Sequence, residues 1–298
     1  MNPKQFIAWH ELKNPVYSHE GWSVKDACMI EKDGLFYVFF SAFFWVDGQE
    51  RSHVVEVKTP DFKTWSDPIL HWRGEADGWL GLCSPNITEA NGVYYLTYNS
   101  WGDKPGQPNQ LFYARSTDLE HWEAPQRLAQ NLTAGTRAID AAVIFHAQKY
   151  YLVWKAAQIS QIAVCERMDG DWTHLGQACQ YWFENAHFID IDGKIHLVLT
   201  SRDDQHRTSI AAMAGDGSRD KDWTQWHDYR PFNIPTEAFN LYEQANAGFL
   251  MDWRARDGYF YLLYAGTTEG LSHARRGDNR LGVARSQDLN LWDIPPGG

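Results

Sequence analysis

Three acidic residues, Asp26, Asp140 and Glu184, lie in unlike stretches of the chain but at nearly the same distance before a predicted turn. Asp26 precedes Gly34 of an Asp-Gly pair, Asp140 precedes Gln148 by the same interval, and Glu184 precedes Gly193 by an interval that is one position longer. Several carboxylates at one place raise the pKa of at least one of them, as a proton donor working near neutral pH requires. The pattern predicts acid–base chemistry by paired carboxyls if the fold brings the three together.

Each acid also has a structural interpretation when taken alone. It can cap the start of a strand, or it can pair with a nearby cation such as Lys25 or Arg137. Against this, the neighbours of the three acids are mostly apolar or small, whereas an aspartate that forms a turn is usually flanked by Gly, Ser and Pro. Three acids in register favour a shared site over three separate caps.

A repeated phrase predicts the fold that must position these acids. It reads Ser or Thr, any residue, Asp, an apolar residue, any two residues and Trp, and its copies begin at Thr59, Ser116 and Ser286. The second interval is close to three times the first, which leaves room for two degenerate copies ending at Trp172 and near Trp223. A period of this length is typical of propellers and arrays. We expect the phrase itself to be structural, because Asp and Ser shape turns and the Trp packs between units.

Each unit contains two apolar runs separated by a turn, followed by a third short run. Four of the five turns contain Asp-Gly or Asn-Gly, the strongest hairpin signals, and 15% of the residues are aromatic, which favours strands. The sequence predicts an all-β fold, a single-domain five-bladed β-propeller. The predicted blades are 20–72, 79–130, 137–178, 182–230 and 243–298, and residues 1–19 supply a ring-closing strand, for which residues 6–9 are the candidate. The first strands of such blades begin at one mouth, where the acids would converge.

Charge and composition narrow the class of partner. The chain has 27 basic and 38 acidic residues, a net charge of −11, which disfavours nucleic acid. No apolar stretch approaches the roughly 20 residues of a membrane span, and the first residues lack the apolar core of a signal peptide, so we expect a cytoplasmic protein. Its 4 cysteines show no CxxC or zinc spacing and are expected to be free thiols. No metal or cofactor is predicted; a calcium ion in the channel has no sequence signature.

The acids and their neighbours resemble the motifs of glycoside hydrolase family 43 and its relatives. Residues 25–27 match a blade-one phrase around Asp, and residues 139–141 match a blade-three phrase, each with Ala in place of the usual Pro. Residues 184–187 match a blade-four phrase and keep its Glu and His, and residues 83–86 replace a Trp-containing phrase of blade two with Cys-Ser-Pro-Asn. The resemblance covers nearly the whole chain.

This resemblance implies a five-bladed propeller that cleaves arabinosides or xylosides with inversion of configuration. It implies that Asp26 is the general base, Glu184 the general acid, and Asp140 the residue that orients Glu184 and keeps its pKa high. Inversion requires the acid and the base to be roughly 6.5–9.5 Å apart, so that a water molecule fits between them and the sugar.

Sugar-binding residues are predicted from side-chain type. Trp45 and Trp101 follow the second strands of blades one and two, where their rings could stack on a sugar or pack in the core. Asn86 is a candidate for a hydroxyl contact, Arg275 for a cationic clamp, and His187 for either the family's channel histidine or a buried structural one.

Two alternatives remain beside the inverting enzyme. Fructan-cleaving propellers of families 32 and 68 retain configuration, but the residues around the three acids fit their motifs less well. Relatives in family 117 use an N-terminal extension, which we do not expect in this protein. A lectin-like propeller would repeat its sugar pocket in each blade, whereas this chain differs from blade to blade. We therefore predict an exo-acting, inverting hydrolase of short oligosaccharides of arabinofuranoside, xyloside or galactoside type. The oligomeric state is not predicted.

Overall fold

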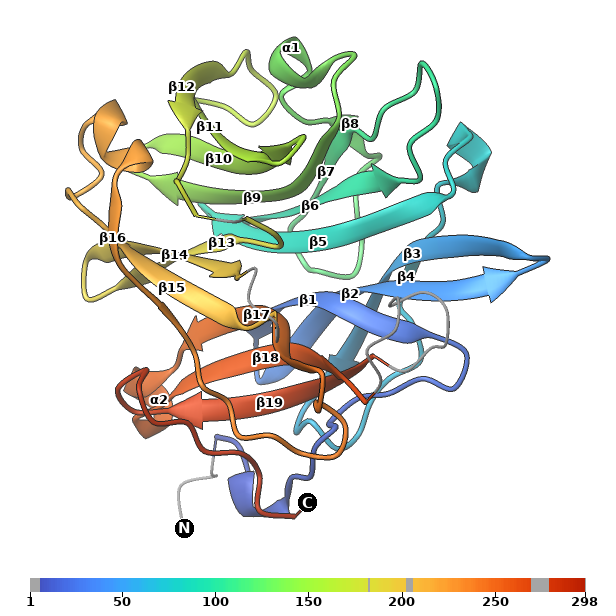
Figure 1. Cartoon of the computed structure of the whole chain (residues 1–298), viewed down its shortest axis with the longest axis vertical. Helices are drawn as coiled ribbons and strands as arrows, with labels where there is room; N and C mark the ends of the chain where they lie inside the picture. The colour runs from blue at the N-terminus through green and yellow to red at the C-terminus, as the bar shows by residue number, and fades with distance from the viewer. Residues whose placement is uncertain (1–5, 182, 202–205, 269–278, 298) are drawn as a thin grey trace.

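The computed structural model of the chain describes residues 6–181, 183–201, 206–268 and 279–297. In these ranges the antiparallel strands fall into five consecutive groups, which we call blades 1 to 5 (Figure 1). A parallel pair, Ser52 with Gly81, joins the first two groups into one sheet. Blade 1 contains β1 (Ser23–Lys32), β2 (Leu35–Val46), β3 (Gln49–Thr59) and β4 (Leu70–Trp72), and blade 2 contains β5 (Gly81–Ala90), β6 (Val93–Trp101), β7 (Leu111–Ser116) and β8 (Gln126–Arg127). Blade 3 contains β9 (Ala138–His146), β10 (Lys149–Ala156), β11 (Ile159–Cys165) and β12 (Thr173–Gln177). Blade 4 contains β13 (His187–Ile191), β14 (Lys194–Thr200), β15 (Thr208–Met213) and β16 (Trp226–Pro231), and blade 5 contains β17 (Glu243–Asp252), β18 (Phe260–Thr267) and β19 (Arg280–Ser286).

The described helices are single turns. They are η1 (Trp9–Glu11), η2 (Glu75–Asp77), α1 (Gln130–Thr133), η3 (Asp220–Thr224) and α2 (Arg254–Asp257). None of them has the length and apolar character needed to cross a bilayer. The all-β prediction is therefore confirmed, with one local error: the Asp-Gly turn expected at the far end of β17 is the helix α2, and Gly258 ends this helix in the left-handed conformation.

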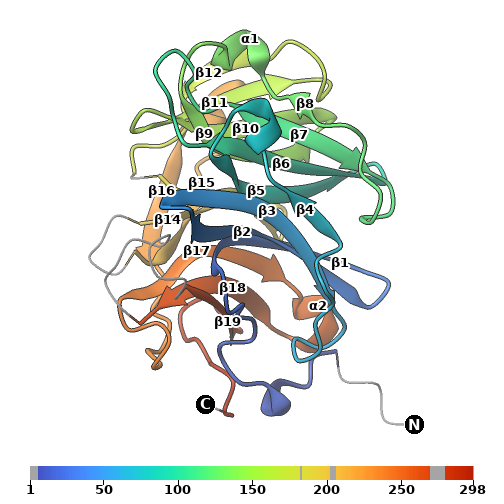
Figure 2. The same ribbon diagram turned by 90° about the vertical axis from the view of Figure 1, so that its right-hand side faces the viewer.

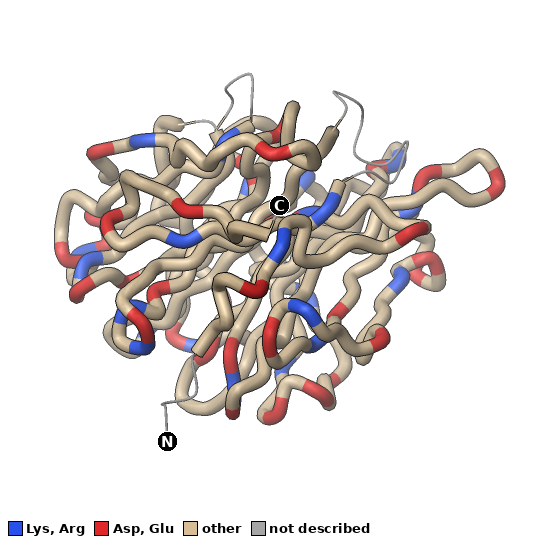
Figure 3. Tube along the Cα trace, turned by 90° about the horizontal axis from the view of Figure 1, so that it is seen from below, with Lys and Arg blue, Asp and Glu red and all other residues tan. Residues whose placement is uncertain are grey.

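The first strands of the blades surround a common axis. β1, β5, β9, β13 and β17 contact one another in a closed order, each touching the first strand of the next blade. Five large apolar clusters among the described residues fill the spaces between neighbouring blades. Residues near the beginning of all five first strands line one cavity, so these strands begin at the same end of the axis, which we call the mouth. Figure 2 shows the molecule turned by 90° from Figure 1. Acidic positions outnumber basic ones along the trace, in keeping with the net charge (Figure 3).

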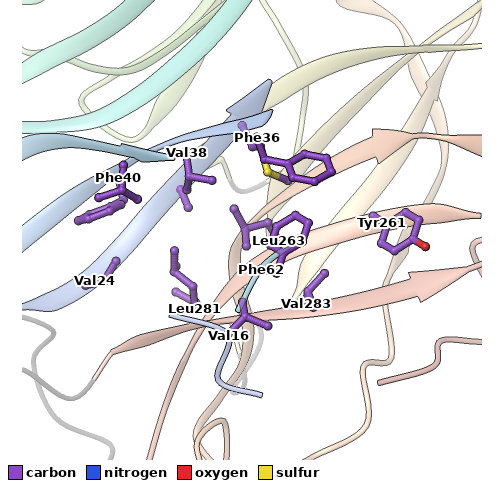
Figure 4. Packing of buried hydrophobic residues seen from close by; sticks show 14 of the residues in the cluster. Val16, Val24, Phe36, Val38, Phe40, Phe62, Tyr261, Leu263, Leu281 and Val283 are labelled. Carbon is purple, nitrogen blue, oxygen red and sulfur yellow. The ribbon is translucent and has the colours of Figure 1, made fainter. Parts of the chain in front are cut away.

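The beginning of the chain joins the last blade and closes the ring. Tyr17 forms a β-bridge with Leu281 of β19, and the Val16 amide donates to the Leu281 carbonyl at 2.8 Å. Trp65 of blade 1 donates its indole N–H to the Val16 carbonyl at 2.9 Å. Figure 4 shows Val16 packed among side chains of blades 1 and 5. The closing segment thus lies near residues 14–17 and not at residues 6–9, where η1 begins.

The repeated phrase forms the same turn wherever it is best preserved. Ser116 Oγ accepts the amides of Asp118 and Leu119, and Asp118 Oδ1 accepts the amides of Glu120 and His121. Residues 59–64 and 286–291 repeat this pattern of side-chain to backbone hydrogen bonds. The aspartates of the phrase are used by the turn and serve structure, as predicted.

Candidate active site

Each blade has a residue in the left-handed conformation near the mouth, within its first strand or, in blade 4, two residues before it. The residues with positive φ there are Asp26 (55°), Ser84 (53°), Asp140 (56°), Asn185 (44°) and Ala247 (47°). In blades 1, 2, 3 and 5 the pairing with the second strand shifts register at this point, as in a β-bulge. A left-handed conformation costs a non-glycine residue roughly 1–2 kcal/mol, and Asp and Asn tolerate it best. A bulge re-aims side chains, and here it supplies the residues that line one narrow cavity on the axis.

Glu184 does not occupy the position predicted for it. In blade 4 the left-handed residue is Asn185, which precedes Gly193 by the same interval at which Asp26 precedes Gly34, so Asn185 corresponds to Asp26 and Asp140. Glu184 comes one position earlier, and its carbonyl accepts the amide of Thr200 at 2.9 Å. The sequence shows this offset, because Glu184 precedes Gly193 by one residue more than Asp26 precedes Gly34. The offset matters because Glu184 is much less buried than the two aspartates: 34% of its side chain is exposed.

Two serines connect the aspartates. Ser41 Oγ donates to Asp26 Oδ2 at 2.8 Å and accepts the backbone N–H of Ser84 at 2.8 Å. Ser84 Oγ donates in turn to Asp140 Oδ1 at 2.9 Å, and Asn185 Nδ2 donates to Ser84 Oγ at 3.4 Å. This chain of hydrogen bonds links blades 1 to 4 across the axis. The structure therefore brings Asp26, Asp140 and the residue beside Glu184 together around a single cavity.

Asp26 has one carboxylate oxygen available for a further contact. Oδ1 is buried, accepts no hydrogen bond from the described residues, and lies 3.7 Å from Lys25 Nζ. Burial raises the pKa of Asp26, while Lys25 and the Ser41 hydrogen bond oppose this rise. Asp26 lines the axial cavity, and a carboxylate oxygen without a donor can bind and activate a water molecule.

Glu184 is held by a lysine that sequence analysis did not identify. Lys155 Nζ, on β10, lies 2.8 Å from Glu184 Oε1, and only 4% of the lysine side chain is exposed. Burial raises the pKa of Glu184, but Lys25 and Lys155 outweigh burial, and the pKa is lower than usual. Burial and the Glu184 charge raise the pKa of Asp140 to about 6. In the free protein the raised pKa is that of Asp140, whereas that of Glu184 is lowered, so the effect of Asp140 on Glu184 stays a prediction.

Blade 5 adds a fourth carboxylate, Glu243, which sequence analysis also missed. Glu243 Oε1 lies 3.3 Å from His206 Nδ1, and Asn279 Nδ2 donates to Oε2 at 3.1 Å. Burial raises the pKa of Glu243, but His206, Lys25 and the amide donors lower it to about 2. Lys25 is surrounded by carboxylates, which raise its pKa despite its burial. The mouth is thus a network of opposite charges. Its members come from several blades, and no local spacing in the sequence links them.

The predicted stacking residues lie at the mouth end but outside the axial cavity. Trp45 is 47% exposed near the tip of the β2–β3 hairpin, which extends beyond the neighbouring strands in Figure 1. Trp101 ends β6 and packs edge-to-face on Phe43, with ring centroids 5.7 Å apart. Trp45 is exposed enough to contact a ligand, and Trp101 mainly packs beside Cys83.

Asn86 and His187 line the axial cavity beneath the acids. Asn86 Nδ2 donates to the Ala186 carbonyl at 3.4 Å, which joins blades 2 and 4 across the axis. His187 accepts the Leu250 amide on Nε2 at 3.0 Å and stacks on Phe249. Burial lowers the pKa of His187 to about 3, so its ring is neutral. Both side chains bond protein groups and form the floor of the cavity.

The arginine clamp is not part of the described site. Arg275 lies outside the described residues. Arg254, another arginine of blade 5, is on α2 at the far end of β17, where it pairs with Asp252 and Asp192.

No metal-binding cluster appears among the described residues. They contain no group of three or more His, Cys, Asp or Glu side chains arranged to hold an ion.

Comparison with known proteins identifies the family of this chain. The model of glycosyl hydrolases family 43 matches residues 12–162 and 85–290. The chain belongs to this family. It is a glycosidase that hydrolyses O-glycosyl bonds, and its fold is the family's β-propeller. A search of curated proteins gave no match.

Solved structures of family members agree in fold. A thermostable family-43 glycoside hydrolase is 14% identical with a TM-score of 0.67, and the match covers 96% of each chain. An exo-1,5-α-L-arabinanase from a bovine ruminal metagenomic library is 16% identical with a TM-score of 0.57, covering 91% of this chain and 96% of the other. CoXyl43, a β-xylosidase/α-arabinofuranosidase from a compost microbial metagenome solved with xylotriose in a calcium-free form, is 15% identical with a TM-score of 0.61, covering 94% and 96%.

Proposed function

We propose that this family 43 protein is an exo-acting, inverting glycosidase of short oligosaccharides with arabinofuranoside, xyloside or galactoside linkages. Asp26 is the general base, Glu184 the general acid, and Asp140 adjusts the protonation of Glu184. The observation that most supports this is the shared cavity, into which the Asp26 and Asp140 carboxyls converge beside the more exposed Glu184.

The environments of the carboxyls suit different roles. Asp26 Oδ2 is fixed by Ser41, which leaves Oδ1 to accept a proton from the attacking water. Glu184 extends toward solvent, where the leaving-group oxygen of a bound sugar would lie. Asp140 is near enough to raise or lower the proton affinity of Glu184, because each charge acts on the other. In inverting hydrolysis, the acid protonates the leaving oxygen while the base activates water on the opposite face.

The shape of the cavity supports action at a chain end. Asn86 and Ala186 join across the axis beneath the acids, so a sugar enters from the mouth and does not continue through the channel. The β2–β3 hairpin, with Trp45 exposed, stands at the mouth and would contact the sugar or its leaving group.

A panel of chromogenic arabinofuranosides, xylosides and galactosides tests this proposal. Wild type is expected to cleave at least one, and Asp26→Asn and Glu184→Gln are expected to lower kcat by at least about 10²-fold. NMR of the first anomer formed distinguishes inversion from retention. The proposed roles fail if wild type cleaves a substrate and both variants cleave it at the same rate.

A further inference from the structure

A second cleft lies outside the axial cavity, between blades 1 and 2. It has a volume of about 1080 Å³ and is lined by residues of β4, the η2 segment, β5, β6 and β7. β5 contributes Leu82 to this cleft but Ser84 and Asn86 to the axial cavity. In Figure 2, β4 lies next to the strands of blade 2. The two hollows are thus separate sites that share one strand.

One wall of the cleft is aromatic. The Trp72 and Tyr98 ring centroids are 5.3 Å apart, and Tyr98 stacks on Phe112 at 5.7 Å with an interplanar angle of 14°. Tyr98 is buried, whereas Trp72 and Phe112 are partly exposed. Partly exposed rings in a concave site are the surfaces on which the C–H faces of sugars pack.

The other wall is polar and is held in place before any ligand binds. Glu75 Oε1 lies 2.8 Å from His53 Nε2, and His53 Nδ1 lies 2.6 Å from His71 Nε2. Lys104 Nζ donates to the Gly78 carbonyl at the end of η2. These contacts attach the η2 segment to blade 1 on one side and to the β6–β7 loop on the other, so the cleft is preformed.

The polar groups of this cleft include an acceptor and a donor without partners. Glu75 Oε2 and Arg127 Nε are buried and make no hydrogen bond with the described residues. Arg127 packs its guanidinium over the Phe112 ring, 5.2 Å from the centroid. A buried polar atom without a partner is costly, so each such atom needs an explanation. A hydroxyl group, which both donates and accepts, can satisfy either one once a rotation of the side chain exposes that atom to the cleft.

We propose that this cleft binds a neutral oligosaccharide, as a second carbohydrate site separate from the catalytic one. Aromatic rings on one wall and hydrogen-bonding groups on the other match a sugar, which has apolar faces and polar edges. Arg73 and Arg127 are balanced by Glu75 and Asp77, and the chain as a whole has a net charge of −11, so an anionic chain is disfavoured. The second site would hold a polysaccharide while its free ends reach the mouth.

Affinity electrophoresis tests the site without relying on turnover. Glu184→Gln is run in native gels containing arabinan, arabinoxylan, galactan or xyloglucan, alone and combined with Trp72→Ala and Phe112→Ala. At least one polysaccharide is expected to retard the parent, and removal of both rings is expected to weaken the apparent affinity by about tenfold or more. Tyr181→Ala is the matched control, because it removes a partly buried ring that stacks on Tyr229 elsewhere.

A second variant distinguishes a loss of binding from a folding defect. Glu75→Gln keeps the rings and the size of the side chain, and it is expected to weaken retardation as well. In the wild-type background, the same cleft variants should leave kcat on a small chromogenic glycoside unchanged, which also shows that they fold. Equal retardation of parent and cleft variants, or no retardation of the parent by any of the four polysaccharides, would overturn the proposal. A protein that is retarded through the cleft yet cleaves no glycoside would instead contradict only the proposed reaction.

Discussion

Lys155 Nζ lies 2.8 Å from Glu184 Oε1, and the lysine is almost fully buried. On β10 the lysine is paired with Ile139, the residue before Asp140, so its charge also acts on Asp140 and opposes the rise in pKa of that carboxyl. One ammonium therefore acts on the proposed acid and on its modulator. In the free protein it lowers the pKa of Glu184 and limits the rise in the pKa of Asp140.

Removing the Lys155 charge should move the pH profile upward. In Lys155→Met, the pKa of Glu184 is expected to rise by about one unit or more, because an ion pair at this distance typically lowers a carboxyl pKa by about 1–3 units. The alkaline limb of the kcat/KM profile should shift by a similar amount. Lys149→Met, at the other end of β10, is the control. An unchanged alkaline limb in Lys155→Met would mean that the lysine acts only in folding.

The free enzyme should show a bell-shaped kcat/KM profile with its optimum on the acidic side of neutrality. The base Asp26 must be ionised, so activity is lost as pH falls through its pKa, which burial raises above the usual range. The Asp140–Glu184 pair must hold one proton, so activity is also lost as pH rises through the pKa at which the pair loses that proton, which burial and the Glu184 charge raise to about 6. Initial rates at substrate concentrations far below KM measure both limbs. An alkaline limb well above neutrality is incompatible with this assignment.

Leaving-group dependence separates the proposed acid from the proposed base. Glu184→Gln should lose about 10²- to 10⁴-fold in kcat on an alkyl glycoside or a disaccharide, whose leaving oxygen needs a proton. It should lose far less on a dinitrophenyl glycoside, whose leaving group departs as the anion. Asp26→Asn should be impaired on both, because water activation does not depend on the leaving group. The same loss for both variants on both substrates would contradict the division of roles.

The parts of the fold that depend on local sequence could be predicted. The Asp-Gly and Asn-Gly turns and the repeated Ser-x-Asp phrase each reflect hydrogen bonds or conformations among residues that are close together in the chain. These local signals were sufficient to predict the all-β propeller and to place Asp26 and Asp140 at equivalent positions in their blades. The helix α2 was missed because Asp257-Gly258 resembles a hairpin turn. In the structure, Gly258 is instead the left-handed residue at which the helix ends.

The charge interactions within the site could not be predicted from local sequence. Lys155, Glu243 and His206 come from three different blades, and their effect on Glu184, Asp140 and Lys25 depends on distances set by the closed ring. Lys155 follows a buried Trp in an ordinary strand and has no motif of its own. Long-range charge pairs of this kind, and the cleft between blades 1 and 2, appear only when the blades are assembled.

Ring closure gives a prediction for stability. Asn14 is buried and makes two hydrogen bonds with Val283 of β19: its Nδ2 donates to the carbonyl at 3.1 Å, and its Oδ1 accepts the amide at 2.9 Å. Asn14→Ala would leave both backbone groups unpaired in the interior, at about 1–3 kcal/mol for each group. The free energy of unfolding should therefore fall by roughly 2–6 kcal/mol in urea titrations followed by tryptophan fluorescence. Gln287→Ala, at an exposed position just after β19, should change it by less than about 0.5 kcal/mol. If Asn14→Ala matches this control, the segment at residues 14–17 does not hold the ring closed.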